Sequence, residues 1–91
     1  MIWDSKKKAT AVFEDGTEIH FEFKVPTMKD YEELGDTANS NEAFLKKFLI
    51  SCDGFENADA LYNAGGAMAL VYLIVKTIAE SGNVPVTLKN A

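Results

Sequence analysis

The sequence predicts a small α+β domain, in which an N-terminal antiparallel β-hairpin packs on about three α-helices. Polar and apolar residues alternate strictly over residues 18–25, which is typical of a strand with one wet and one buried face. Apolar residues then recur at helical spacing from residue 28 onward, and residues 60–75 carry no charge. A chain of 91 residues supports one core. We therefore expect a single domain over residues 1–82 and a loose tail over residues 83–91.

The hairpin is predicted to join residues 8–13 to residues 18–25 through a three-residue loop, residues 14–16. This loop places every apolar residue of both strands, Phe13 included, on one face. A two-residue loop would move Phe13 to the polar face, because a slip of one residue inverts the two faces of a strand. We expect Gly16 to adopt the left-handed conformation that the longer loop requires.

Capping residues mark the first helices. Thr27 is the expected N-cap of the first helix, with Asp30 in a capping-box position, and Gly35 either ends or weakens that helix. The second helix is predicted over residues 41–52, where apolar residues recur at i, i+3 and i+4. Asn57 or Asp59 is then expected to cap a short helical turn.

The last helix is predicted to run from near Asn63 to Gly82 and to form the centre of the core. Residues 64–74 are apolar all round, which indicates burial on most sides, or burial on one side and a docked partner on the other. The stretch is too short for a membrane span, which needs about 20 mostly apolar residues. The residues expected in the core are Leu70, Leu73 and Ile74.

Composition narrows the classes of function. The net charge is −5, and all nine basic residues are lysines, so the guanidinium fork that reads bases and clamps phosphates is absent. We therefore expect no nucleic-acid partner and no membrane partner. The single cysteine excludes an intramolecular disulfide and a cysteine-rich zinc site, and a cytoplasmic location is the default expectation.

No group of residues predicts catalysis, a metal site or a cofactor. His20 falls on the polar face of a strand without a nucleophile beside it in the sequence, and Cys52 follows an apolar stripe next to Asp53. The acidic residues between Asp30 and Asp36 lack the spacing of a calcium loop and are interpreted as a solvated helix face. The sequence therefore predicts a protein that acts by binding and is not an enzyme.

Aromatic and flexible apolar side chains are the candidates for partner binding, because such residues anchor many interfaces. Burial of all of them in the monomer is the alternative. The candidates are Trp3, Phe55, Tyr62, Met68 and Tyr72.

The order of motifs resembles that of phage tail assembly chaperones, the short tail proteins of P2-like, Mu-like and related long-tailed phages. The resemblance begins at the Pro-Thr-Met-Lys-Asp-Tyr-Glu-Glu-Leu segment, residues 26–34, which follows an amphipathic hairpin. It continues through Leu34-Gly35, an apolar helix like residues 44–52, the Gly54-Phe55 step and a final apolar helix. It covers roughly residues 8 to 80. Asn63 and the following glycine pair depart from the more acidic start that is usual for the last helix.

The resemblance implies a function. Such chaperones bind the long, helical tape-measure protein and keep it soluble until tail-tube subunits polymerise around it. They work in the host cytoplasm and are absent from the finished virion. The implied partners are the tape-measure protein and, second, the tail-tube protein, and exposed apolar surface would also support a homo-oligomer. The alternative is a small phage- or host-encoded regulatory binding module, such as an antitoxin-like protein or an adaptor.

Overall fold

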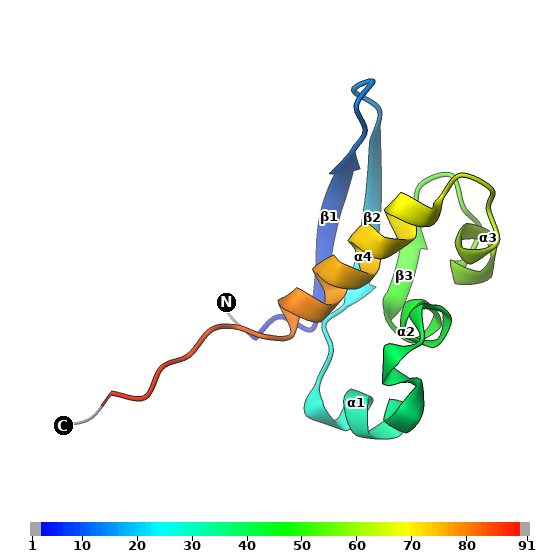
Figure 1. Ribbon diagram of the computed structural model, residues 1–91. Helices are drawn as coiled ribbons and strands as arrows, with labels where there is room; N and C mark the ends of the chain where they lie inside the picture. The colour runs from blue at the N-terminus through cyan, green and yellow to red at the C-terminus, as the bar shows by residue number, and fades with distance from the viewer. Residues whose placement is uncertain (1–2, 90–91) are drawn as a thin grey trace.

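The protein is described by a computed structural model over residues 3–89 (Figure 1). An antiparallel sheet of strand order β1-β2-β3 carries α4 across one face, which confirms the predicted α+β class. In chain order the elements are β1 (Lys6–Val12), β2 (Glu18–Lys24), α1 (Met28–Leu34), the 3₁₀ helix η1 (Gly35–Asn39), α2 (Asn41–Phe48), β3 (Leu49–Cys52), α3 (Ala58–Tyr62) and α4 (Met68–Ser81).

The hairpin has the predicted register and loop. Ala11 pairs with Ile19, and the backbone N–H of Phe13 donates to the carbonyl oxygen of Thr17 at 2.9 Å. Gly16 has φ of 90°, the left-handed conformation that a three-residue loop needs. Whether a strand residue has an odd or an even number therefore determines whether its side chain faces α4.

The predicted capping residues of α1 and α3 are confirmed. Thr27 accepts a hydrogen bond from the N–H of Asp30 at 3.1 Å, and the Asp30 carboxylate accepts one from the N–H of Thr27 at 3.0 Å. Gly35, with φ of 53°, ends α1. Asn57 caps α3 by accepting the N–H of Ala60 at 2.8 Å.

The predicted helix over residues 41–52 is wrong in its last third. The helix ends at Phe48, and the next four residues form β3, which pairs antiparallel with β2. Cys52 lies opposite Phe21 and Leu49 opposite Phe23, with a bulge between these pairs. Leu49 and Cys52 do continue the helical spacing of α2, but hydrogen bonding to β2 satisfies their backbone and decides the conformation.

The last helix begins later than predicted. Residues 63–67 form turns instead of helix, and Gly66 has φ of 86° there. Leu70 and Ile74 are buried as expected, but the expectation for Leu73 is wrong, because this side chain is 44% exposed. A helix that is apolar all round does not reveal by its sequence which side meets the sheet.

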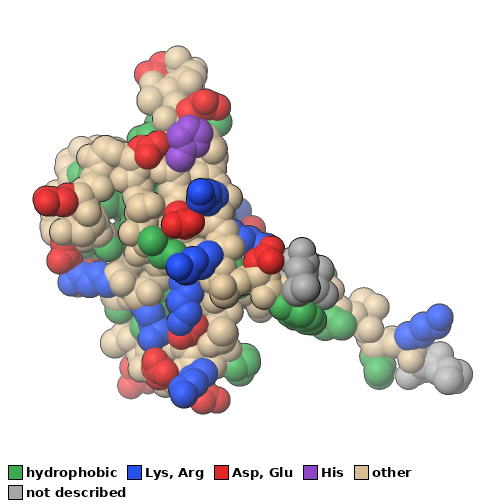
Figure 2. Space-filling model, turned by 180° about the vertical axis from the view of Figure 1, so that it is seen from behind, with side chains coloured by type: hydrophobic (Ala, Val, Ile, Leu, Met, Phe, Trp, Pro, Cys, Tyr) green, Lys and Arg blue, Asp and Glu red, His purple; other side chains and the backbone are tan. Residues whose placement is uncertain are grey.

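The core lies between one face of the sheet and the helices α2 and α4. Its fully buried large side chains are Phe23, Phe48, Leu45, Leu61, Ile74 and Ile78. The other face of the sheet is open, and acidic, basic and histidine side chains are interspersed on it (Figure 2).

Residues 83–89 have no secondary structure and extend away from the body of the protein (Figure 1). None of the helices formed by residues 3–89 has the length and apolar character that crossing a membrane requires.

Candidate partner-binding surface

Three of the five predicted binding residues meet where α3 leads into α4. Tyr62, Met68 and Tyr72 are 41%, 67% and 55% exposed. They surround a depression of about 240 Å³, here called the α3–α4 hollow. Its remaining lining residues are Asn41, Ala64 and Val71.

The local sequence explains how these side chains come together. Met68 and Tyr72 are four residues apart on α4, so they lie on the same side of the helix one turn apart. Tyr62 ends α3, and the N–H of Asn63 donates to the carbonyl of Asp59 at 3.0 Å to close that helix. The turns that follow, with Gly66 in the left-handed region, return the chain to the start of α4.

An ion pair joins α2 to α3. The ammonium group of Lys46 on α2 lies 3.0 Å from the carboxylate of Asp59 on α3 and 3.5 Å from that of Glu42. Asp59, and secondarily Glu42, raise the pKa of Lys46 above its usual value. The ion pair links α3 to α2, which contributes Asn41 to the hollow.

The other two predicted binding residues lie elsewhere. Trp3 is 75% exposed and borders a separate depression of about 360 Å³ with Met28 and Val84. Phe55 is partly buried against the core, and its N–H donates to the carbonyl of Cys52 at 3.1 Å. The sequence prediction did not include Met28, which is 77% exposed although it starts an amphipathic helix.

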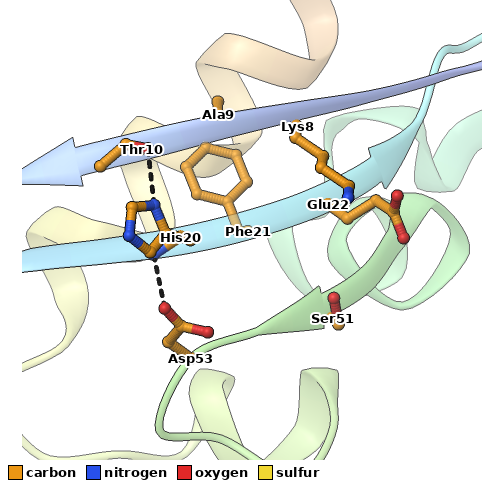
Figure 3. Close-up of a pocket in the computed structure, with 8 residues that line it drawn as sticks. All are labelled: Lys8, Ala9, Thr10, His20, Phe21, Glu22, Ser51 and Asp53. Carbon is orange, nitrogen blue, oxygen red and sulfur yellow. Dashed lines mark hydrogen bonds between the residues drawn. The ribbon is translucent and has the colours of Figure 1, made fainter.

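The open face of the sheet carries a shallow polar depression of about 460 Å³ (Figure 3). His20 Nδ1 lies 2.8 Å from Thr10 Oγ1. The Asp53 carboxylate accepts the backbone N–H of His20 at 3.0 Å, and the Asp53 N–H donates to the His20 carbonyl at 2.9 Å. Asp53 therefore extends the pairing of β2 with β3 and does not orient the imidazole as the partner of a catalytic base would.

Cys52 ends β3 with a buried side chain, and this burial, together with the charge of Asp53, raises the pKa of the thiol. A thiol with a raised pKa stays protonated at neutral pH and is a poor nucleophile. Within residues 3–89, no group of three or more histidine, cysteine or acidic side chains is placed to hold a metal ion.

The acidic residues of α1 differ from the solvated face that the sequence predicted, because Asp30 is only 5% exposed. Its carboxylate accepts a hydrogen bond from Lys24 Nζ at 2.8 Å, in addition to the capping bond from Thr27. Lys24 is the main cause of the lowered pKa of Asp30, and Thr27 adds to it. Lys47 on α2 lies 3.9 Å from the same carboxylate and 3.0 Å from that of Glu33. This cluster fixes α1 between β2 and α2.

Comparisons with family models, curated proteins and solved structures each found no match for the chain.

Proposed function

We propose that this protein is a phage tail assembly chaperone, which binds the tape-measure protein and keeps it soluble until the tail tube forms around it. The observation that carries the proposal is the exposure of Tyr62, Met68 and Tyr72 around one hollow. The sequence resemblance over roughly residues 8 to 80 supports the same function.

The α3–α4 hollow suits an amphipathic helix as its occupant. Helices bind grooves through apolar side chains spaced three or four residues apart, and the volume of the hollow matches side chains better than a folded domain. Tyrosine offers a large contact area with few rotatable bonds, and methionine adapts its shape to different neighbours. Such a surface can hold successive segments of a long helical protein whose sequences differ.

The mechanism is binding by mass action, without catalysis. A chaperone that binds the tape-measure chain before assembly covers apolar stripes that would otherwise associate with each other. Polymerising tube subunits then displace it, so it acts in the host cytoplasm and is absent from the virion. The tail-tube protein is the second partner in this scheme, because it replaces the chaperone on the same chain.

Substitutions at Met68 and Tyr72 test the proposal, with Met28 as the control. Met68 and Met28 are each the first residue of a helix and are 67% and 77% exposed, but only Met68 lines the hollow. Co-expression with the tape-measure protein should raise its soluble fraction and yield a purifiable complex. Met68→Ser combined with Tyr72→Ser should weaken that complex at least about tenfold, as for anchor residues of an interface, and Met28→Ser should not.

Two outcomes would contradict the proposal. In one, the tape-measure protein is equally insoluble with and without the chaperone and no complex forms. In the other, the complex forms but responds to Met28→Ser and not to the Met68 and Tyr72 substitutions, which would move the binding surface to the depression beside Met28. Circular dichroism of each variant shows whether the fold is retained.

A further inference from the structure

β1 is a strand of seven residues whose outer edge has no neighbouring strand within residues 3–89. Odd-numbered residues of β1 bond to β2, as shown by the bonds between Phe13 and Thr17 and between Val25 and Ser5 on either side of the strand. Hydrogen bonding alternates along an antiparallel strand, so the N–H and C=O groups of the even-numbered residues point away from β2. An edge of this length is a template for another strand.

The two ends of this edge carry opposite charges. Lys6, Lys7 and Lys8 begin β1, and Glu14 and Asp15 follow its end in the hairpin loop. The ion pairs formed within residues 3–89 involve none of these five side chains. An antiparallel copy of the same edge would bring the basic end of one strand to the acidic end of the other.

Exposed apolar side chains gather at the same edge. Val12 is 66% exposed, Phe13 39% and Leu73 of α4 44%. All three border a depression of about 140 Å³ between the end of β1 and α4. Covering these side chains would add an apolar contribution to strand pairing.

We propose that β1 pairs antiparallel with β1 of a second copy, about a twofold axis that passes through Thr10. This register places Lys6 opposite Glu14 of the second copy and Lys8 opposite its Val12. It forms a continuous sheet of order β3-β2-β1-β1-β2-β3, with both α4 helices on the same face. The interface is isologous, as in most homodimers.

Parity and charge favour this register, which places a lysine opposite Glu14 at each end. Only even-numbered residues present free backbone groups, so the two residues that pair must both be even. A register centred on Lys8 would set this lysine opposite itself, which is unfavourable. Lysines on an edge strand usually discourage pairing, but in the proposed register Lys6 gains an acidic partner at each end of the interface.

This inference goes beyond the proposed function and uses a different surface. The α3–α4 hollow is lined by residues of α2, α3 and α4, and α3 lies on the β3 side of the molecule, away from β1 (Figure 1). Dimerisation would therefore leave the hollow accessible. If the protein does not bind the tape-measure protein, the proposed dimer still stands. If no dimer forms, the proposed binding of the tape-measure protein still stands.

Charge-swapped variants test the pairing by sedimentation equilibrium, in which the parent should approach twice the 10.0 kDa chain mass as concentration rises. Lys6→Glu alone and Glu14→Lys alone should each raise the dimer dissociation constant about tenfold, since two attractive contacts become repulsive in each dimer. An equimolar mixture of the two variants should restore dimerisation, because only the heterodimer pairs opposite charges at both positions.

Lys29→Glu is the matched control for Lys6→Glu, because Lys29 is exposed on α1, away from β1. The two substitutions change the net charge by the same amount. It should leave the dimer unchanged. A parent protein that stays monomeric at every concentration would overturn the proposal. A dimer that ignores Lys6→Glu, or a mixture of the two variants that stays monomeric, would overturn it equally. Slow hydrogen exchange at the amides of Lys8 and Thr10, lost on dilution to the monomer, is the additional expected result.

Discussion

The helices α1 and α4 are attached to the rest of the protein by different kinds of contact. Four apolar residues of α4 are buried: Leu70, Val71, Ile74 and Ile78. In α1 the only buried residue is Asp30, which bonds to Lys24 and Thr27. Apolar packing is non-directional and independent of pH, whereas the Asp30 cluster is directional and depends on ionisation. The attachment of α4 is therefore apolar, whereas that of α1 combines the Asp30 cluster with the partly buried side chains of Tyr31 and Leu34.

The largest expected effect separates the two sides of α4. Leu70 is 4% exposed and Leu73 is 44% exposed, one turn apart on the same helix. Leu70→Ala should lower the free energy of unfolding by about 2–5 kcal/mol, because it leaves a cavity in the core. Leu73→Ala should lower it by less than about 1 kcal/mol. Urea denaturation of both variants measures the difference, and equal losses would contradict the division of α4 into a buried and an exposed side.

A smaller effect is expected where α1 is held by charge. Asp30→Asn removes the ion pair with Lys24 and should cost about 1.5–3 kcal/mol, the usual range for a hydrogen bond to a charged group. Asp15→Asn is the control, because Asp15 also accepts a backbone N–H, from Thr17, but is exposed in the hairpin loop. Thermal unfolding should show a clear decrease in Tm for the first variant and little change for the second. A Tm for Asp30→Asn that matches the parent would show that the cluster does not stabilise the fold.

The smallest expected effect is a pH dependence specific to Asp30. Its pKa in the folded protein is lowered below 3.8, chiefly by the hydrogen bond from Lys24. The folded state thus favours the ionised carboxylate, and this contribution is fully present above pH 3.8 and decreases as pH falls through the lower folded value. The difference in unfolding free energy between the parent and Asp30→Asn should be constant from neutral to mildly acidic pH and shrink below about pH 4. The apolar variant Leu70→Ala should show no such trend.

Local signals in the sequence predicted the local structure correctly. The register of the hairpin followed from the alternation of residues 18–25 and the position of Gly16, which leave one parity that keeps Phe13 off the polar face. Thr27, and Asn57 as one of two candidates with Asp59, were predicted as caps because side chains of these types accept nearby backbone N–H groups, as both do in the structure. Neither prediction required knowledge of distant contacts.

Features that depend on distant contacts were missed. β3 continues the apolar spacing of α2, and only its pairing with β2 makes it a strand. The exposure of Leu73 depends on how α4 lies on the sheet, which an evenly apolar helix does not encode. For the same reason, the sequence did not predict that Tyr62, Met68 and Tyr72 border one hollow or that Trp3 lies apart from it. Their grouping arises from the turns between α3 and α4, which were predicted as helix.

The position of Cys52 gives the protein a built-in reporter of local opening. It is the single cysteine of the chain, it is 6% exposed, and it lies on the strand that joins the sheet last along the sequence. An alkylating reagent reaches this thiol only when β3 separates from β2 or the chain unfolds. The rate of alkylation in the native protein thus measures how often β3 opens from the sheet, without any introduced label.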